Sequence, residues 1–313
     1  MQPCTCLFII LDGLGDRQYP ELDGQTPLQA AHTPNLDRLA RLGGNGLYHA
    51  GHLGEPFPSE SAHFALFGYP QNLFPGRGPL EALGAGIDLA EGEVAVLAHF
   101  VSAENRDGTL FVRRDRPEEM DEPEIQAVFD QAAAEFEHRG VELSLHRTKG
   151  LFGVLVLRGK VSPHITDSNP MRDMTLATDI LPWAEAEDML LARATAEVLR
   201  TYLGRTFHRL DRCEVNISRR QRELSPVNAL VTQRAGWKNT VPSFSSRTGL
   251  KGVSIASGAM FQGLAKFIGL DTYNVPGTHA VEADFTARLD LAAKILPEYD
   301  FIHVHTKAPD EAA

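Results

Sequence analysis

The feature that most constrains this chain is a short apolar run near its start, residues 7–11, that stops abruptly at Asp12. Uninterrupted apolar residues over this length are typical of a strand buried on both faces of a parallel sheet. Asp12 would then lie at the carboxyl end of a central strand. Open α/β sheets bind their ligands at that end of the strands. The sequence therefore predicts an α/β fold with a functional site beside Asp12.

The residues after Asp12 leave room for a bound group. Gly13 and Gly15 allow the backbone to turn sharply, and Asp16 adds a second carboxylate. Our interpretation is that Asp12 binds a metal ion. The alternative is that its carboxylate caps the turn after the strand, and spacing alone does not separate the two.

The last residues of the chain repeat this arrangement. An apolar-rich strand is predicted over residues 301–305, and Asp310 follows shortly after it. The carboxyl ends of parallel strands meet at one edge of a sheet. Asp12 and Asp310, on neighbouring strands, could therefore share a metal centre.

Ser59 opens a predicted helix that continues through His63. As an N-cap, its hydroxyl would accept a hydrogen bond from the backbone three residues on. As a nucleophile, it would lie beside a metal ion, with the helix N-terminus stabilising an incoming phosphoryl group. His63 lies one turn later on the same helix face, and we interpret it as a structural histidine.

The order of the predicted elements indicates a doubly wound, mostly parallel α/β sheet into which a second domain is inserted. From about residue 91 the sequence changes to strands rich in Val, Leu and Phe, with an acidic helix at 123–138. We assign residues 1–76 and 237–313 to the main domain and residues 77–236 to the inserted α+β domain.

Capping and periodicity predict further elements. A helix should begin at Pro34 and end at the glycine pair 43–44, with Leu36, Leu39 and Ala40 on its buried face.

A strand is then predicted over residues 46–50. A long helix is predicted over residues 183–203, with Trp183, Leu190 and Val198 in a packed apolar stripe.

Arg77 lies between Gly76 and Gly78. Two small neighbours let a guanidinium group approach a ligand closely, and arginine is suited to bidentate binding of phosphate or carboxylate. A surface turn would have a similar sequence, so both interpretations stay open here.

Composition limits the partners. The chain has 313 residues, 23% of them charged, and a net charge of −11, which argues against nucleic acid or an anionic membrane as partner. Its three cysteines are too few for a disulfide framework and predict a reducing cytoplasm. The first apolar run is too short for a signal peptide, and no run has membrane-spanning length. We therefore expect a cytoplasmic enzyme with a small-molecule substrate; the oligomeric state is not predicted.

Several motifs, taken in order, resemble the archaeal-type 2,3-bisphosphoglycerate-independent phosphoglycerate mutases, a branch of the alkaline phosphatase superfamily. They are Ile10-Leu11-Asp12-Gly13-Leu14-Gly15-Asp16, Thr33-Pro34-Asn35-Leu36-Asp37, Ser59-Glu60-Ser61-Ala62-His63, the stretch from Gly76 to Gly86, and Lys307-Ala308-Pro309-Asp310-Glu311-Ala312. The match is dense to about residue 90 and patchy afterwards.

The resemblance implies an alkaline-phosphatase-like core with an inserted lid domain and two divalent metal ions, Mn²⁺ with Mg²⁺ or Zn²⁺ as alternatives. It implies that a metal-bound serine takes the phosphoryl group from 3-phosphoglycerate and returns it to the 2-hydroxyl. By this match Asp12, Ser59 and Asp310 bind metal, and Ser59 is the nucleophile. Arg77, Arg234 and Asp167 bind the phosphorylated carboxylate substrate.

The chain departs from the family pattern at several positions. Asn169 and Met171 replace an expected Asp and His in the lid, and Gln262 replaces a lysine. The family continues after the Asp310 motif with histidine and aspartate ligands, so the C-terminal part of the core is expected to be missing here. The alternatives are therefore a related metal-dependent phosphatase or phosphomutase on another small phosphoester, and a catalytically impaired homologue that binds a ligand or partner.

Overall fold

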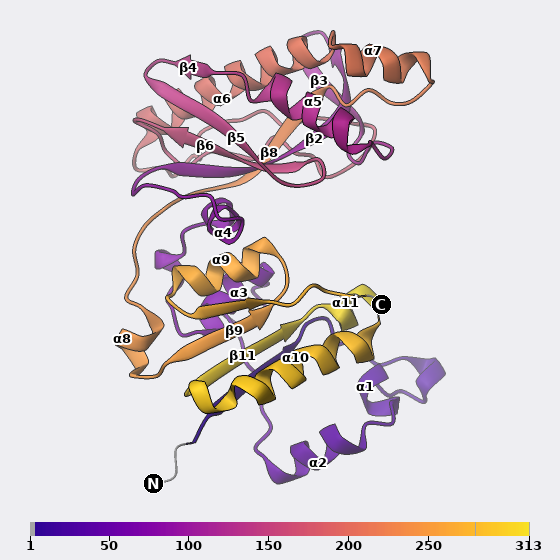
Figure 1. Cartoon of the computed structure of the whole chain (residues 1–313), viewed down its shortest axis with the longest axis vertical. Helices are drawn as coiled ribbons and strands as arrows, with labels where there is room; N and C mark the ends of the chain where they lie inside the picture. Colours follow the sequence, from indigo (N-terminus) through magenta and orange to yellow (C-terminus); the bar gives the residue numbers. More distant parts are fainter. Residues whose placement is uncertain (1–3, 279, 313) are drawn as a thin grey trace. The chain divides into compact units, whose positions relative to one another are not determined.

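The computed structural model describes residues 4–278 and 280–312, and the chain divides into two compact units. Unit 1 combines Met1–Phe74 with Val241–Ala313, and unit 2 is Pro75–Thr240 (Figure 1). The domain boundaries expected from the sequence were 76/77 and 236/237.

Unit 1 is built on a parallel sheet that has, in the described residues, the strand order β1-β11-β9-β10. Its strands are β1 (Cys6–Leu11), β9 (Gly252–Ala256), β10 (Asp271–Asn274) and β11 (Phe301–Thr306). Its helices are α1 (Pro27–Ala30), α2 (Pro34–Leu42), α3 (Ser59–Leu66), α8 (Phe244–Thr248), α9 (Ala259–Phe267), α10 (Val281–Ile295) and α11 (Ala308–Ala312), with short 3₁₀ turns at Pro20–Leu22, Gln71–Leu73 and Leu296–Glu298.

Helices cover both faces of this sheet because its strands alternate between two sets of buried side chains. Ile302 and Val304 of β11 pack with Ala292 and Ile295 of α10 on one face. His303 and His305, which point to the other face, both contact the His63 ring of α3, and His305 also contacts the Phe261 ring of α9. The alternation thus separates an aliphatic face from a face rich in imidazole.

The structure contradicts the prediction that β1 is a central strand buried on both faces. β1 pairs with β11 and lies at the edge of the sheet, and the side chains of Leu7 and Ile9 are 43% and 38% exposed. The strand itself forms as predicted from the apolar run. It is not central, because no strand in the described residues pairs with its outer side.

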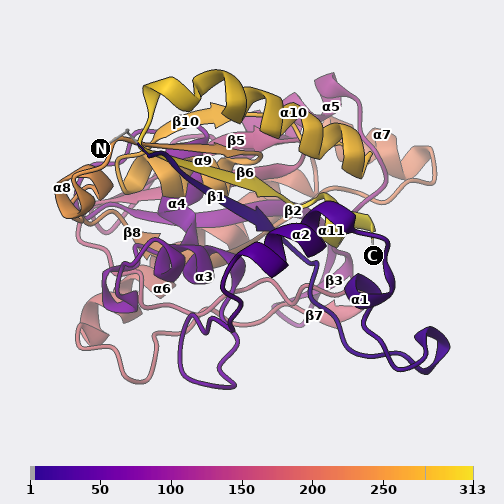
Figure 2. The ribbon, with the colours of Figure 1, turned by 90° about the horizontal axis from the view of Figure 1, so that it is seen from below.

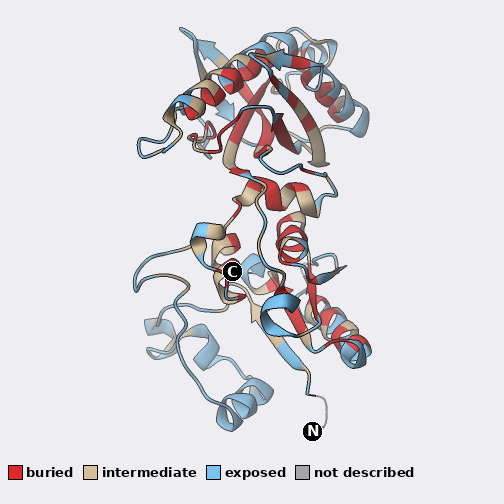
Figure 3. Ribbon diagram, turned by 90° about the vertical axis from the view of Figure 1, so that its left-hand side faces the viewer, coloured by how far each residue is buried: buried red, intermediate tan, exposed pale blue. Residues whose placement is uncertain are grey.

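The helix predicted from Pro34 forms as α2, but its burial does not. Leu36 and Leu39 are 40% and 66% exposed, Ala40 is exposed, and α2 contains no buried residue in the described chain (Figure 3). The strand predicted over residues 46–50 is absent from the described structure, where this segment is an exposed loop. Both predictions needed a neighbouring layer that the described residues do not provide.

Unit 2 contains a largely antiparallel sheet with strand order β4-β5-β6-β2-β3-β7 in the described residues, and β8 also pairs with β2. The strands are β2 (Val94–Arg106), β3 (Thr109–Arg114), β4 (Phe136–His138), β5 (Val141–Lys149), β6 (Phe152–Arg158), β7 (Thr175–Leu176) and β8 (Ala229–Trp237). The helices are α4 (Arg77–Gly84), α5 (Glu122–Ala132), α6 (Met189–Leu210) and α7 (Glu214–Gln221).

Two predicted helices of unit 2 have different bounds in the structure. The acidic helix ends at Ala132, because residues 136–138 pair with β5 as β4. The long helix begins at Met189 rather than 183, because the indole of Trp183 donates a hydrogen bond to the Ile165 carbonyl outside any helix. Leu190, assigned to the packed stripe, is 84% exposed.

No helix within the described ranges combines the length and the apolar character needed to cross a membrane.

Arg219 holds α7 against α5 through a fully buried guanidinium group. It contacts a Glu124 carboxylate oxygen at 3.1 Å and donates to the Ser225 carbonyl at 2.9 Å. We expect Arg219→Ala to lower the free energy of unfolding by about 3 kcal/mol, because the fully buried guanidinium group is lost together with its ion pair to Glu124 and its hydrogen bond to the Ser225 carbonyl. The neighbouring control, Arg220→Ala, removes an exposed ion pair with Asp211 and should cost less than about 1 kcal/mol. Urea unfolding followed by circular dichroism compares them, and equal losses would contradict the assignment.

Candidate active site

Unit 1 brings Asp12 and Asp310 to the same edge of its sheet. β1 and β11 are parallel neighbours, and the Asp12 amide donates to the Thr306 carbonyl at 3.0 Å just past their ends. Gly13 adopts a positive φ of 80°, and a Cβ there would lie 2.5 Å from the Asp310 Cα. Glycine is required because the two backbones approach so closely. The Asp310 side chain is 54% exposed and lies 3.9 Å from Lys307.

The Asp12 carboxylate contacts a buried histidine of the neighbouring strand. The distance between Asp12 Oδ2 and His305 Nε2 is 3.4 Å, and the His305 side chain is fully buried. Its other ring nitrogen, Nδ1, is buried without a hydrogen-bond partner in the described residues. A proton on Nε2 satisfies this arrangement, since the donor then faces the Asp12 carboxylate.

A second histidine links this contact to Ser59. His63 Nδ1 donates to the Ser59 carbonyl at 2.7 Å, and its ring packs edge-on against His305 with the centroids 4.9 Å apart. Phe261 of α9 packs against both rings. Ser59 and Asp12 are thus joined through two imidazoles in contact.

Burial determines the protonation of this group. Desolvation lowers the pKa of His63 to about 4 and that of His303 well below its ordinary value, so both are neutral at pH 7. The hydrogen bond from His305 lowers the pKa of Asp12, partly opposed by burial. The result is an ionised Asp12 carboxylate in a cluster where His63 and His303 are neutral.

Ser59 is the first residue of α3, and Pro58 occupies the position before the helix. Because Pro58 and not Ser59 occupies the N-cap position, the N-cap interpretation of Ser59 is wrong. Ser59 instead begins the first turn of α3, whose backbone N–H groups have no partner within the helix and favour anions.

Oxygen atoms dominate the candidate metal-binding groups. The carboxylates of Asp12 and Asp310 and the hydroxyl of Ser59 are the hard donors that Mn²⁺ or Mg²⁺ prefers. Within residues 4–278 and 280–312, no group of three or more His, Cys, Asp or Glu side chains is arranged to hold a metal ion. The donor types therefore fit a divalent cation, while a complete set of ligands is not assembled in the described chain.

Two predicted substrate-binding residues meet in unit 2. Arg234 lies on β8 with a positive φ of 55°, and its amide donates to Asp167 Oδ1 at 2.7 Å. Burial raises the pKa of Asp167. The strained Arg234 backbone is characteristic of a functional position.

Arg77, the first residue of α4, lies near the same strand. A Cβ on Gly236 would be 2.8 Å from the Gly76 Cα, so the start of α4 and the end of β8 are in backbone contact. Arg77 Nε lies 3.7 Å from Glu81. Arg77 and Arg234 thus flank one close backbone approach within unit 2.

The residues that depart from the family pattern have defined contacts. Asn169 is buried. Its side-chain Nδ2 donates to Gln233 Oε1 at 3.4 Å, and its Oδ1 accepts from the backbone N–H of Met171 at 2.8 Å. Met171 is 66% exposed. In unit 1, Gln262 is buried and its amide donates to the carbonyls of Ala256 and Tyr273, which joins the ends of β9 and β10.

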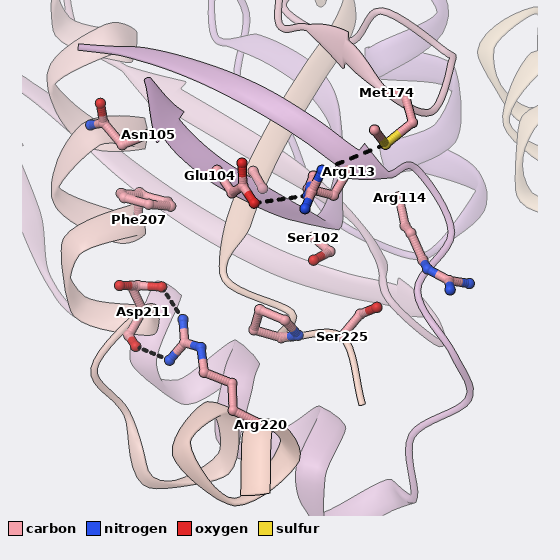
Figure 4. A pocket seen from close by; sticks show the side chains of 12 residues that line it. Ser102, Glu104, Asn105, Arg113, Arg114, Met174, Phe207, Asp211, Arg220 and Ser225 are labelled. Atoms are coloured by element: carbon pink, nitrogen blue, oxygen red, sulfur yellow. Dashed lines mark hydrogen bonds and ion pairs between the residues drawn. The ribbon is translucent and has the colours of Figure 1, made fainter. Parts of the chain in front are cut away.

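Unit 2 also contains a polar cavity of about 840 Å³ (Figure 4). Arg113 pairs with Glu104 at 2.8 Å, and Arg220 pairs with Asp211. Arg114, also drawn, pairs with Glu118 at 3.3 Å, so each of the three arginines that line the cavity has an acidic partner.

Sequence reasoning missed His305 as the partner of Asp12. A signal was present, because His303 and His305 alternate within an otherwise apolar strand and therefore share one face. A pair of histidines on one face of a core strand indicates a polar group opposite them.

The chain was compared with known proteins. It matches the family described as 2,3-bisphosphoglycerate-independent phosphoglycerate mutase over residues 40–216. The enzyme of that name from Methanopyrus kandleri is 37% identical over 312 residues, which cover 98% of this chain and 72% of the relative. The chain belongs to this family.

A second relative agrees with the assignment. The 2,3-bisphosphoglycerate-independent phosphoglycerate mutase 1 of Methanocaldococcus jannaschii is 35% identical over 316 residues, covering 100% of this chain and 75% of the relative. The solved structure of the cofactor-independent phosphoglycerate mutase from Thermoplasma acidophilum has a TM-score of 0.64 and 31% identity, covering 97% of this chain and 77% of that one. About a quarter of each phosphoglycerate mutase lies outside the match.

Asp284 anchors the end of β11 beside the site. Its carboxylate accepts from Arg288 Nε at 2.7 Å and from the Thr306 hydroxyl at 2.5 Å, and the Arg288 pair lowers its pKa to about 2. Because the pKa of Asp284 is lower in the folded protein than its value near 3.8 in the unfolded chain, the ionised carboxylate stabilises the fold above pH 3.8. This stabilisation is lost as the pH falls toward 2. Asp284→Asn should therefore lower the free energy of unfolding at pH 7 by about 2 kcal/mol.

Unfolding measured from pH 7 to pH 2 tests this expectation. The Asn variant should show a weaker loss of stability on acidification than the wild type, and Asp290→Asn, an exposed position on the same helix, should behave like the wild type. An unchanged acid profile in Asp284→Asn would contradict it.

Replacing His305 should change the ionisation of Asp12. His305→Ala removes the hydrogen-bond donor that stabilises the carboxylate, so we expect the pKa of Asp12 to rise. His305→Gln places an amide N–H near the position of Nε2 and should keep the pKa lowered. Carboxyl ¹³C NMR titration measures both, and identical titration of wild type and the two variants would disprove the contact.

Proposed function

We propose that this chain interconverts 3-phosphoglycerate and 2-phosphoglycerate through a phosphoserine at Ser59. The observation that carries the proposal is that Ser59, the first residue of α3, is linked through His63 and His305 to Asp12 in a member of this family. A serine in this environment can act as a nucleophile toward an anionic phosphoryl group.

Four candidate site residues of unit 1 have a role in this proposal. Asp12, Ser59 and Asp310 would provide oxygen ligands to two divalent cations, Mn²⁺ first and Mg²⁺ or Zn²⁺ as alternatives. Such cations, when bound, neutralise phosphoryl oxygens and lower the pKa of a serine hydroxyl. His305 keeps the Asp12 carboxylate ionised and oriented, a supporting contact of the kind that metal ligands usually have.

The proposed reaction has two balanced transfers. The Ser59 oxygen attacks the phosphorus of 3-phosphoglycerate, and the bond from phosphorus to the 3-oxygen breaks as that oxygen gains a proton. The glycerate then reorients, its 2-hydroxyl attacks the phosphoserine, and Ser59 recovers a proton. Water must be excluded between the two steps, because it would release free phosphate instead.

Unit 2 would act as the lid that binds the substrate. Arg77 and Arg234 would bind its phosphate and carboxylate by charge-assisted hydrogen bonds, and Asp167 holds the Arg234 backbone. In this proposal the enzyme works in glycolysis in the cytoplasm, where its free cysteines, Cys4, Cys6 and Cys213, remain reduced.

Ser59→Ala tests the assignment of the nucleophile. With Mn²⁺ and 3-phosphoglycerate, we expect formation of 2-phosphoglycerate to fall by more than about 1,000-fold, because the covalent step is lost. Ser61→Ala on the same helix is the matched control and should retain activity. A Ser59→Ala variant with wild-type turnover would refute the proposal.

A second candidate is a metal-dependent phosphatase or phosphomutase for another small phosphoester. Asn169 and Met171 favour it, since a buried amide and an exposed thioether replace an acid and a histidine in unit 2. A panel of small phosphoesters in the same assay separates the candidates: release of free phosphate supports a phosphatase.

A catalytically impaired homologue is the third candidate, favoured by the incomplete set of metal ligands in the described residues. Calorimetric titration of the 313-residue chain with Mn²⁺ tests it, and tight binding of two ions would exclude it.

A further inference from the structure

The polar cavity of unit 2 lies at the far end of β2 from the residues assigned to substrate binding. β2 pairs with β8 through Leu97 and Gln233, next to Arg234, and it pairs with β3 through Ser102 at the cavity. In Figure 2, β3 and β7 are labelled at the opposite side of unit 2 from β8. At about 3.3 Å per residue, Leu97 and Ser102 are about 16 Å apart along the strand. The cavity is therefore separate from the site that contains Arg234.

The ion pairs around the cavity contain more arginines than carboxylates. Glu104 is shared by Arg106 and Arg113, at 3.2 Å and 2.8 Å, and Glu118 is likewise shared by two arginines. Counted together, these pairs contain six arginines and four carboxylates: Arg106, Arg113, Arg114, Arg219, Arg220 and Arg222 with Glu104, Glu118, Glu124 and Asp211. Two positive charges are thus in excess here, although the chain as a whole has a net charge of −11. A local excess of this sign attracts anions.

Arg113 faces the cavity with a guanidinium group that its partners only partly satisfy. Its Nε lies 2.8 Å from Glu104, and its Nη1 faces the Met174 sulfur at 4.0 Å (Figure 4). A thioether is a weak acceptor, whereas the donors of a guanidinium group match the oxygens of a phosphate. Both side chains of the pair with Glu104 are 44% exposed, and exposed pairs contribute little to stability. A phosphate group can therefore compete for Arg113.

Ser102 adds a hydroxyl group without a partner to the same cavity. The residue is only 3% exposed, and its hydroxyl makes no hydrogen bond within residues 4–278 and 280–312. In Figure 4 its side chain lies among those of Arg113, Arg114 and Ser225. Buried polar groups are almost always hydrogen-bonded, so a buried hydroxyl that lines a cavity indicates a partner in the cavity.

We propose that this cavity is a second ligand site and that it binds a phosphomonoester with hydroxyl groups, such as a sugar phosphate. Arg113 and the Ser102 hydroxyl would bind the phosphate, and Asn105 and Ser225, which also line the cavity, would face the hydroxyl groups of the ligand. The volume of about 840 Å³ is within the usual range for small-molecule sites. The proposal does not depend on the phosphoserine reaction, so either can fail without the other.

Calorimetric titration with ribose 5-phosphate tests the site. We expect saturable binding to the 313-residue chain, no detectable binding of ribose, and at least about tenfold weaker binding to Arg113→Ala, because charge-assisted hydrogen bonds to the phosphate are lost. Arg158→Ala is the matched control, since Arg158 is also a strand residue with 44% exposure whose Nε lies 2.8 Å from a glutamate. This control should bind ribose 5-phosphate like the wild type.

Two further variants separate this cavity from the candidate active site. Ser102→Ala removes one hydroxyl without changing the charge and should weaken binding about fivefold. Arg234→Gln should bind ribose 5-phosphate like the wild type, because Arg234 lies near the other end of β2. In both the wild type and Arg234→Gln, the Nε–H signal of Arg113 in a ¹H–¹⁵N spectrum should shift on titration.

Four results would overturn the proposal. They are the absence of saturable binding, equal binding of ribose and ribose 5-phosphate, equal binding to the wild type and Arg113→Ala, and loss of binding in Arg234→Gln. The last result would place the ligand at the candidate substrate-binding residues instead of the cavity.

Discussion

The parallel pairing of β1 with β11 is the constraint on which the candidate site depends. Residues far apart in the sequence become neighbours because Leu11 pairs with Thr306, so each strand delivers its following acid to one edge. Gly13 then permits the backbone approach to Asp310. If this register slipped by one residue, His305 would leave the face that meets Asp12, since successive side chains point to opposite faces.

The buried imidazoles connect the stability of unit 1 with its chemistry. Burial lowers the pKa of His63 to about 4, so its ring is neutral at pH 7, and Phe261 packs against the rings of both His63 and His305. One holds the Ser59 carbonyl and the other faces the Asp12 carboxylate. The aromatic packing of Phe261 therefore determines the positions of polar groups as well as filling the core.

The exposed side of β1 shows how the fold and the site are related in this family. The same strand presents Asp12 at its end and uncovered Leu7 and Ile9 along its length. The relatives are longer by about a quarter of their length. β1 thus contributes to the candidate site at its carboxyl end and presents exposed apolar side chains along its length.

Several features could be predicted from sequence because they depend on local pattern. The strand ending at Asp12, the helix beginning at Ser59 and the start of α2 follow from apolar runs, glycine and proline. The burial of Leu39, the length of α6 and the strand expected at 46–50 could not, because each depends on what packs against the segment.

The sequence by itself determined which residues form strands, where acids follow them, and to which family the motifs point, because these properties are carried by short stretches of chain. Only the tertiary structure decided that β1 lies at an edge, that His305 is the partner of Asp12, and that Gln262 joins β9 to β10. Those outcomes depend on contacts between distant residues; the alternation of His303 and His305 indicates a shared face, but not which residue lies opposite it.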